Sequence, residues 1–595
     1  MCGIGGILFF KENKRVLQEK IEILNNTQLH RGPDEQTILI LTPHAFCHQR
    51  LTLVDAKGGQ QPFKDNSGRY LLVYNGELYN YKELRAILSS EYSFRTNSDT
   101  EVILAAYLVW GESCLNHFNG MFAFFIWDTI AERGFAARDP LGVKPFVYFY
   151  QNGTFYFSSE VKSLLKILDN TTQIDPYQLA EYIIAPSLSG GGDLSIFKGI
   201  KYLEPGSYIF ITPSDMKTKR YYSFNWNPVE LEESLLIDLM GKEVEKSVEI
   251  SLTAGTPTGI FLSGGLDSSL IAAIAVKHSK NPLKAYTIIF DDHESIHFDP
   301  STIVNSDDLP YTRELAHLLK IPLNYSKIYH QDISTTLRSL SEINDRIPAW
   351  EQEITQHALS QSASTSLKAV LVGDASDEIN YGYFFLLNPL INYSPSKLIE
   401  FIGGNKRMEL LTPEFKKRID PLGYLDNKYR KIAKNAGYDF DKNADESILA
   451  MSTLIHNNWL SRLLHNGDIY SMRFGLEARV PFANLNFLQI ASKIHPKIGF
   501  KKGVEKYLLR KVASKWLPDK FFNRKKSALP RDPRLGCYYK KILKSLLVEK
   551  NDFIDTFLDR KALSKLCTPG PVSETDRVLL FHMICLIHWS RFHVK

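Results

Sequence analysis

A glycine-rich loop between an apolar run and a helical pattern constrains the fold of this chain most strongly. The apolar run is Thr258–Leu262, the loop is Ser263–Ser269 and the helical pattern is Ser268–His278. Backbone N–H groups at a glycine turn and at a helix N-terminus attract phosphate. The loop lacks the Gly-Lys-Ser/Thr ending of the common γ-phosphate loop. It therefore predicts a strand, a pyrophosphate-binding loop of another kind, and a helix.

The same alternation continues after this loop. Ala285–Phe290 and Ala369–Val372 have the apolar character of buried parallel strands, and Asp308–Lys320 has a helical pattern. Alternating strands and helices predict a doubly wound α/β sheet. From about Pro389 onward the pattern becomes largely helical.

The first 160 residues have a different pattern, with many short β-type runs. This pattern predicts a mixed α and β domain with antiparallel strands. Two helical stretches, Lys82–Leu88 and Thr100–Trp110, interrupt the short β-type runs. A glycine stretch, Ser189–Asp193, is expected to be a flexible loop. Because one core rarely grows beyond about 300 residues, we expect two domains, at 1–222 and 235–595. The β-type runs are Gly5–Phe9, Thr37–Leu41, Tyr70–Tyr74, Met121–Trp127, Phe146–Phe149 and Thr154–Ser158.

Composition excludes several classes of protein. The net charge of +5 over 595 residues gives no case for nucleic-acid or membrane partners. No apolar run approaches the roughly 18 residues of a membrane span, and the N-terminus lacks the features of a secretory signal. The 6 cysteines form no C-x-x-C pair, which argues against a zinc site or a disulfide framework. We expect a cytoplasmic protein.

Cys2 lies directly behind the start methionine and could act as a nucleophile. A free cysteine has a pKa of about 8.5, and an N-terminal α-amine of pKa about 8 can serve as base to its own side chain. This chemistry requires removal of Met1. Asn75 and Gly76 follow a predicted strand and could form an oxyanion hole.

Other polar residues could bind the charged groups of a free amino acid such as glutamine. Arg50 can bind a carboxylate in bidentate fashion, and Glu77 and Asp99 can bind an ammonium group. Each residue alone fits ordinary surface or turn chemistry, but the set in this order makes coincidence improbable.

These residues lie in motifs that resemble the class II glutamine amidotransferases. The resemblance implies an N-terminal-nucleophile fold, a four-layer α-β-β-α sandwich. It implies that Cys2 attacks the glutamine amide, that Asn75 and Gly76 stabilise the oxyanion, and that Arg50, Leu53, Val54, Glu77 and Asp99 bind glutamine. The motifs are Cys2–Ile4, Arg31–Asp34, Arg50–Asp55, Asn75–Tyr81, Ser98–Glu101 and Ala137–Pro145.

Charged residues cluster in three further motifs of the C-terminal part. Gly373–Glu378 follows a predicted strand and offers three carboxylates where ligands of open α/β sheets bind. Asp267, in the glycine-rich loop Ser263–Ser269, is also well placed to hold Mg²⁺. Glu477–Phe482 and Gly503–Lys506 add a pair of cations, and a cation could neutralise leaving pyrophosphate.

These motifs, in this order after such an N-terminal domain, resemble the glutamine-hydrolysing asparagine synthetases over the whole chain. The resemblance implies that ATP adenylates a carboxylate, pyrophosphate leaves, and tunnelled ammonia attacks the acyl-adenylate. Mg²⁺ would be held by Asp267 and Asp377, Lys506 would stabilise the leaving pyrophosphate, and Asp374 would help to deprotonate the incoming ammonium. A homodimer is implied by the resemblance alone. The further ATP-binding residues that it implies are Leu262, Ser263, Gly264, Gly265, Ser268, Ile289 and Gly373, with Leu262 and Ile289 framing adenine.

The departures from the family pattern concern the acceptor. Asp374 replaces a glutamate, Asn484 replaces an aspartate, and Ile347–Ser362 has no clear counterpart of the family's aspartate-pocket segment. Aspartate is therefore one expected acceptor, and a sugar acid, a peptide or a specialised metabolite is the alternative. A catalytically silent protein is disfavoured because both sets of catalytic residues are present.

Overall fold

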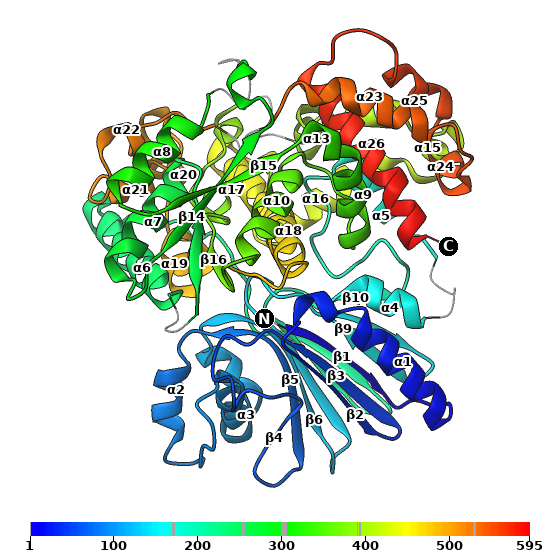
Figure 1. The fold of residues 1–595 in the computed structure, drawn as a ribbon, viewed down its shortest axis with the longest axis vertical. Coiled ribbons are helices and arrows are strands. Elements are labelled where there is room, and N and C mark those ends of the chain that lie inside the picture. Colours follow the sequence, from blue (N-terminus) through cyan, green and yellow to red (C-terminus); the bar gives the residue numbers. More distant parts are fainter. Residues whose placement is uncertain are drawn as a thin grey trace.

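The computed structural model describes residues 2–168, 173–252, 256–298, 306–388, 391, 394–527 and 531–594. Met1 and Pro389, named above, lie outside them. The described chain forms two six-stranded antiparallel sheets in its N-terminal half and a five-stranded parallel sheet in its C-terminal half (Figure 1). We use "N-terminal half" for the chain up to the end of β12 (Met216–Arg220) and "C-terminal half" for the chain from the start of α6 (Glu233–Ile250).

The two antiparallel sheets pack face to face between helices. The apolar layer between them contains Ile4, Phe46, Val73 and Phe125, all nearly inaccessible to solvent. Helices α1 (Lys14–Asn26) and α4 (Val161–Ile167) cover one sheet; α3 (Asp99–Trp110) packs on the other, with α2 (Tyr81–Leu88) against it. This is the expected four-layer α-β-β-α sandwich. In spatial order the sheets are β10 (Ile200–Tyr202), β8 (Val147–Gln151), β9 (Thr154–Ser158), β1 (Cys2–Leu8), β3 (His44–Arg50) and β2 (Glu35–Leu41), and β12, β11 (Ser207–Ile211), β7 (Arg133–Arg138), β6 (Gly120–Asp128), β5 (Tyr70–Leu78) and β4 (Phe63–Lys64).

The parallel sheet confirms the predicted doubly wound α/β fold. Strand order reverses between β13 (Thr258–Phe261) and β16 (Ala369–Leu371), and ligands of such sheets bind at this switch point. The glycine-rich loop follows β13, and Gly373 follows β16. The sheet order is β15 (Leu323–Ile328), β14 (Lys284–Phe290), β13, β16 and β17 (Glu477–Arg479), with α6, α7 (Leu266–His278), α8 (Leu309–Leu318), α10 (Gln352–Ser364) and α18 (Ser461–Met472) packed around it.

The rest of the C-terminal half is largely helical, as predicted. The long helix α26 (Glu574–His593) is buried along most of its length and packs on α9 (Ile333–Ile343). No helix of the described residues is both long enough and apolar enough to span a membrane. The remaining helices include α5 (Pro176–Ile184), α11 (Ser376–Ile379), α13 (Pro395–Phe401), α14 (Gly404–Glu409), α15 (Pro413–Ile419), α16 (Pro421–Asn435), α17 (Ala444–Leu454), the π-helix η6 (Ile455–Leu460), α19 (Leu485–Ala491), α20 (Pro496–Gly499), α21 (Tyr507–Ala513), α22 (Asp519–Phe522), α23 (Leu535–Leu546), α24 (Asp552–Phe557) and α25 (Arg560–Leu566).

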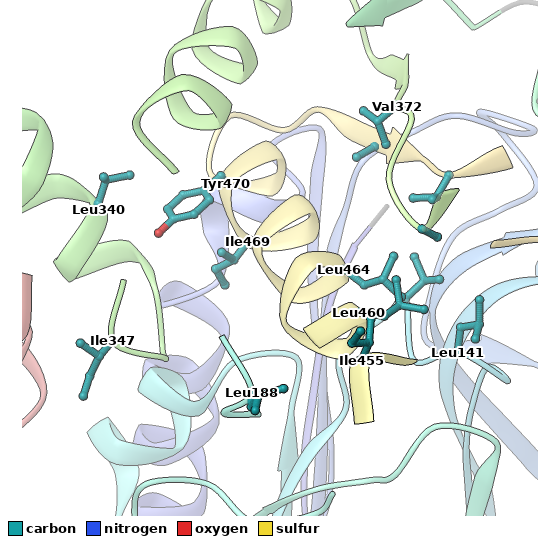
Figure 2. Close-up of a cluster of buried hydrophobic side chains, with 14 of the residues drawn as sticks. Leu141, Leu188, Leu340, Ile347, Val372, Ile455, Leu460, Leu464, Ile469 and Tyr470 are labelled. Carbon is teal, nitrogen blue, oxygen red and sulfur yellow. The ribbon is translucent and has the colours of Figure 1, made fainter. Parts of the chain in front are cut away.

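One buried hydrophobic cluster extends across both halves. Leu141 and Leu188 of the N-terminal half belong to the same buried cluster as Val372 and Leu464 of the C-terminal half (Figure 2). Separating the halves would therefore expose apolar surface on both sides, at a cost of roughly 25 cal/mol per Å².

The glycine stretch at 189–193 is a loop, as expected, but its first three residues are buried. Ser189, Gly190 and Gly191 are buried against η6. A Cβ atom at Gly191 would lie 2.6 Å from Cγ of Asn458, whose Nδ2 donates to the carbonyl of Leu188 at 2.8 Å. Glycine is needed here because the two halves approach each other closely.

Two further expectations need correction. Asn75–Glu77 does not follow a strand but lies within β5, which extends to Leu78 because it pairs with β6 along its whole length. Asp267 is not in the loop but in the first turn of α7, which begins at Leu266. All six cysteines are free thiols.

Two candidate active sites

A pocket in the N-terminal half brings together nearly all of the residues assigned to glutamine chemistry. Cys2, at the start of β1, faces residues from β5, from the start of α3 and from the loop that follows β3. The predicted residues on its wall are Cys2, Arg50, Leu53, Val54, Gly76, Glu77 and Asp99, and Leu51, Gly59, Gln61, Tyr74, Ser98 and Thr100 complete it.

Asn75 connects to this pocket through the backbone of Cys2. The Cys2 nitrogen, which becomes the α-amine when Met1 is removed, donates to Asn75 Oδ1 at 2.9 Å. Asn75 Nδ2 is buried and has no hydrogen-bond partner in the described part of the chain. A buried donor of this kind is costly unless a ligand or water satisfies it. At Gly76, a Cβ would lie 2.2 Å from the carbonyl oxygen of Met121, so only glycine fits.

Burial raises the pKa of the Cys2 thiol, and Leu51 N–H and Arg50 offset part of this effect. A buried thiol is a weak nucleophile until a base removes its proton. The only base that Cys2 itself could supply is its α-amine, which donates a hydrogen bond to Asn75.

The charged groups that could bind a free amino acid already form hydrogen bonds with other parts of the protein. Arg50 donates to the carbonyls of Asp55 at 2.8 Å and Ala56 at 3.0 Å, and to Glu35 at 2.9 Å. Asp99 is buried, and burial raises its pKa, although it accepts hydrogen bonds from the Tyr74 hydroxyl and the Leu78 N–H.

Glu77 also contacts an arginine of the C-terminal half, which the sequence did not indicate. Its carboxylate forms a buried ion pair with Arg479 Nε at 2.9 Å, and Arg479 also contacts Glu477 at 2.6 Å. Arg479 is fully buried. We had grouped Arg479 with Lys506 as a pair of cations, but its guanidinium joins β17 to the first pocket.

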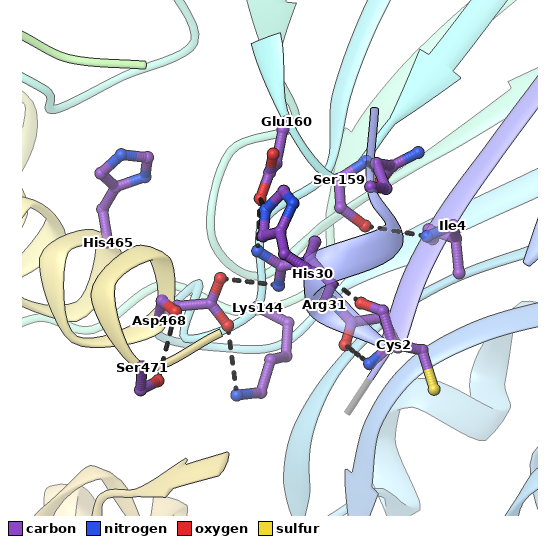
Figure 3. A network of polar contacts seen from close by, with 12 residues as sticks. Cys2, Ile4, His30, Arg31, Lys144, Ser159, Glu160, His465, Asp468 and Ser471 are labelled. Atoms are coloured by element: carbon purple, nitrogen blue, oxygen red, sulfur yellow. Dashed lines mark hydrogen bonds and ion pairs between the residues drawn. The ribbon is translucent and has the colours of Figure 1, made fainter. Parts of the chain in front are cut away.

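Arg31 forms a second buried link between the halves (Figure 3). Its Nε donates to the Cys2 carbonyl at 3.1 Å, and its two terminal nitrogens contact Glu160 at 3.1 Å and Asp468 on α18 at 2.7 Å. Lys144 lies 3.5 Å from the other oxygen of Asp468. The backbone of Cys2 is therefore held by charges from both halves.

The second candidate site lies at the switch point of the parallel sheet. In the loop, the Ser263 and Ser268 hydroxyls are 3.0 Å apart, and Gly264 has a φ of 66°. Gly373 faces the start of α7, where a Cβ on it would lie 3.1 Å from Cβ of Asp267. Leu262 is buried and Ile289 is half-buried on the adjacent strand β14.

A lysine joins the two carboxylates that we assigned to Mg²⁺. Lys506 Nζ lies 2.6 Å from Asp267 and 2.7 Å from Asp377. Burial opposes charge on Asp377, but Lys506 and Lys526 hold its pKa below the usual range. Ser376 donates to the other oxygen of Asp267 at 2.7 Å.

These two carboxylates fit Mg²⁺ in its usual nucleotide-bound form. Both reach the same ammonium nitrogen, so their oxygens lie close together. Mg²⁺ commonly binds through one or two carboxylates plus substrate phosphates. Within the described residues, no group of three or more His, Cys, Asp or Glu side chains could hold a metal ion by itself. The donor set therefore suits a metal that arrives with a phosphate ligand.

The other two carboxylates of the motif differ in environment. Burial, with repulsion from Asp377 and Asp267, raises the pKa of Asp374 to about 6. Its Oδ2 faces α18, where a Cβ on Gly467 would lie 3.4 Å away. Glu378 is buried and accepts a hydrogen bond from the Tyr383 hydroxyl.

Two of the residues that we had linked to the acceptor, Asn484 and Glu351 in the segment Ile347–Ser362, have structural roles. Asn484 caps α19, accepting from the N–H groups of Asn486 and Phe487 at 2.9 and 3.4 Å. Glu351 forms a buried ion pair with Arg577 at 3.0 Å. Asn484 and Glu351 therefore do not argue for a different acceptor, and that interpretation is withdrawn for them.

Sequence reasoning did not single out three residues that complete these sites. Lys526 contacts Asp377 and the Gly382 carbonyl. In the sequence it follows two other cations, Arg524 and Lys525, so no pattern distinguished it from them. Glu160 and Asp468 surround Arg31, at 129 and 437 residues' separation. No local pattern could reveal contacts across such distances.

Two protein-family models match the two halves of the chain. A glutamine amidotransferase domain model matches residues 1–222, and an asparagine synthase model matches residues 240–583. Among solved structures, the allosteric regulatory enzyme of purine biosynthesis matches at 16% identity with a TM-score of 0.29, covering 55% of this chain and 80% of that one.

Curated relatives match over most of their length. Asparagine synthetase [glutamine-hydrolyzing] 3 of Bacillus subtilis (strain 168) is 31% identical, covering 95% of this chain and 93% of the relative. Asparagine synthetase [glutamine-hydrolyzing] 1 of the same organism is 30% identical, over 89% and 87%. Asparagine synthetase B [glutamine-hydrolyzing] of Escherichia coli (strain K12) is 27% identical, over 87% and 80%. The chain therefore belongs to the asparagine synthase family of glutamine-hydrolysing, ATP-dependent carbon–nitrogen ligases.

Proposed function

We propose that this enzyme hydrolyses glutamine at Cys2 and delivers the ammonia to a carboxylate that it has adenylated with ATP. AMP and pyrophosphate are the other products. The observation that carries the proposal is one chain with two sites joined by buried charges. Arg31 contacts the Cys2 carbonyl and Asp468, and Glu77 of the first pocket contacts Arg479 of the parallel sheet.

In the first site, the α-amine of Cys2 takes the proton of its own thiol. The hydrogen bond to Asn75 Oδ1 orients this amine. The thiolate attacks the side-chain amide carbon of glutamine, and the oxyanion is stabilised by Asn75 Nδ2 and Gly76 N–H. Nδ2 is suited to this role because it is buried without a partner. The protonated α-amine then gives its proton to the amide nitrogen, the C–N bond breaks and ammonia leaves. Water hydrolyses the remaining thioester to glutamate and frees the thiol. Arg50 binds the substrate carboxylate and Asp99 its ammonium group.

In the second site, the Ser263–Ser269 loop and the first turn of α7 bind the phosphates of ATP. Mg²⁺ held by Asp267 and Asp377 would neutralise phosphate charge. Lys506, which is 4% exposed and next to both carboxylates, stabilises the pyrophosphate as it leaves.

Asp374 is the group that we assign to ammonia delivery. It faces α18, whose Asp468 contacts Arg31 beside Cys2. A carboxylate with a pKa of about 6 is ionised at pH 7 and can take a proton from ammonium. Ammonia is then free to attack the acyl-adenylate.

Aspartate is the acceptor that we propose first, because the relatives' names specify asparagine synthesis. The test is pyrophosphate release from purified enzyme with ATP, Mg²⁺ and glutamine, with and without aspartate. We expect aspartate-dependent release with equal amounts of asparagine and AMP. Glutamine hydrolysis without aspartate-dependent pyrophosphate would contradict aspartate as the acceptor.

A run of aromatic side chains favours a larger carboxylate as the second candidate. Tyr383, whose ring lies 4.5 Å from Lys526 Nζ, packs on Trp459 with ring centres 5.3 Å apart. Trp350 stacks on Trp459 at 5.8 Å. Phe384 is 58% exposed in the same segment. Aromatic faces beside Lys526 and Asp377 suit an acceptor with a ring or an apolar body.

The same assay distinguishes the two acceptors. A panel of ring-bearing and aliphatic monocarboxylates replaces aspartate, and Trp459→Ala is compared with wild type. If the acceptor is larger, a panel member releases pyrophosphate faster than aspartate, and Trp459→Ala raises its KM. If aspartate is the acceptor, only aspartate releases pyrophosphate.

A further inference from the structure

A cavity separate from both candidate sites lies where the C-terminal end of α26 meets the N-terminal half. Its volume is about 440 Å³, within the range of small-molecule pockets. It is walled by α4, the ends of α9, α18 and α26, and the segment around His30. Figure 1 shows α4 close to the chain's C-terminal end.

The lining is strongly basic. Three permanent cations, Lys162, Lys166 and Arg473, face one carboxylate, Glu342. The side chains of Lys166 and Arg473 have no hydrogen-bond or ion-pair partner in the described part of the chain, whereas Lys162 contacts Glu160 at 2.9 Å. Because like charges repel, Lys166 and Arg473, which pair with no carboxylate among the described residues, favour a bound anion.

The rest of the wall is apolar and partly aromatic. Phe197 and Phe592 line it together with Leu165 and Ile174. Rings of this kind offer flat faces to a ligand ring. Lys166 and Arg473 beside apolar walls suit a ligand with an anionic group at one end and a ring or apolar part at the other.

We propose that this cavity binds a small organic anion, a phosphate or carboxylate on a ring or apolar body, and that binding changes glutamine hydrolysis. Lys166 and Arg473 hold the anionic group, and Phe197 and Phe592 hold the rest.

Direct contacts connect the cavity to the first candidate site. His30 and Lys162 line the cavity, and each contacts Glu160 at 2.9 Å. Glu160 binds Arg31 at 3.1 Å, and Arg31 donates to the Cys2 carbonyl at 3.1 Å (Figure 3). An anion that attracts Lys162 weakens its hold on Glu160. Glu160 then shifts relative to Arg31, and the backbone of the nucleophile shifts with it.

The binding test uses phenyl phosphate, phenylacetate and inorganic phosphate as probes in calorimetric titrations of the full-length protein. A saturating non-hydrolysable ATP analogue with Mg²⁺ is present, so that the loop after β13 is occupied. We expect phenyl phosphate to bind with 1:1 stoichiometry and more tightly than inorganic phosphate. Lys166→Gln and Arg473→Gln should each weaken it about tenfold or more, because each removes a charge-assisted contact. Lys280→Gln, at an exposed lysine outside the cavity, is the matched control.

Each outcome decides a part of the proposal. Tight binding of phenylacetate identifies carboxylates as ligands, and its absence restricts the class to phosphates. No saturable binding of any probe, or binding that neither variant weakens, overturns the site.

The second readout is glutamine hydrolysis, measured without ATP or acceptor. Saturating phenyl phosphate should change kcat/KM for glutamine at least twofold in wild type and in Lys280→Gln, but not in Arg473→Gln. Equal rates with and without the probe would overturn the link to Cys2. Neither readout requires amide synthesis, so failure of the proposed acceptor chemistry remains a separate result.

Discussion

At the scale of residues, each site depends on side chains whose charges are balanced by distant partners. Arg31 is completely buried and contacts Glu160 and Asp468. Breaking a buried ion pair leaves a charge without compensation and costs about 3–5 kcal/mol. Arg31 is therefore a positioning residue for Cys2.

Cys2→Ala should abolish glutamine-dependent synthesis and leave synthesis from added ammonium salts. The substitution removes the thiol that we assign as nucleophile and leaves Asp267, Asp377 and Lys506 untouched. AMP formation is measured with glutamine and then with ammonium chloride. Loss of both activities in a folded variant would contradict two separable sites.

Asp267→Asn should leave glutamine hydrolysis unchanged and reduce AMP formation by about 10²-fold or more, because it removes a charge that we assign to Mg²⁺ binding and a partner of Lys506. Glutamate and AMP are measured in parallel. Asp292→Asn, at an exposed aspartate in the same half, serves as the control. AMP formation at the wild-type rate would refute the assigned role.

The Cys2 pocket illustrates what sequence can predict about a site. Cys2, Arg50, Glu77 and Asp99 lie far apart in sequence, yet the motif resemblance grouped them, and the fold brings them into one pocket. Their roles stay predictions. Partners such as Asp468 could not be foreseen, because buried pairing depends on how two domains dock.

At the scale of elements, apolar periodicity identified strands that are buried on both faces and missed polar ones. β13, β14 and β16 were predicted within two residues of their observed ends. β15, with the sequence Leu323–Ile328, and β17 were missed, because an edge strand with polar residues carries no apolar run. At Ser189–Asp193 the glycines predicted a flexible loop. In the structure, Gly191 instead allows the chain to pack closely against Asn458.

Gly191→Ala should destabilise the fold by about 1–3 kcal/mol, because the added methyl group overlaps the Asn458 side chain in a packed interface. Urea unfolding measures the effect. Gly241→Ala is the control, since its Cβ would lie 3.7 Å from Val512 in ordinary contact inside α6. Equal stabilities of wild type and Gly191→Ala would mean that the loop is not tightly packed.

The N-terminus of α4 gives a pH prediction. Asp345 of the C-terminal half accepts from the N–H groups of Val161 at 2.7 Å and Lys162 at 3.0 Å, and burial raises its pKa to about 6. The folded state therefore binds a proton more tightly than the unfolded state, so the contribution of Asp345 to stability is lost as the pH rises from about 4 through about 6.

The substitution Asp345→Asn should remove this loss of folding stability with rising pH. A shift of about two pKa units corresponds to about 3 kcal/mol, so the free energy of unfolding of the variant relative to wild type should rise by up to that amount between pH 4 and pH 7. A difference that stays constant with pH would contradict a raised pKa for Asp345.

At the scale of the whole molecule, the chain joins an antiparallel sandwich to a parallel sheet through one buried hydrophobic cluster and buried ion pairs. Leu141 and Val372 lie in the same apolar cluster, and Glu77 and Arg479 pair across the same boundary. The sequence predicted both folds and their order. It could not predict how they dock, because docking rests on contacts more than 400 residues apart, such as Glu77 with Arg479.

The central claim is that ammonia passes from Cys2 to the second site inside the protein. Its most direct test supplies glutamine labelled with ¹⁵N at the amide, an equal concentration of unlabelled ammonium, ATP, Mg²⁺ and the carboxylate that supports AMP formation. Mass spectrometry of the product amide gives the origin of its nitrogen. The account predicts that the product carries ¹⁵N almost exclusively at early times, and that Cys2→Ala yields only unlabelled product. Label diluted in proportion to the ammonium in solution would contradict it.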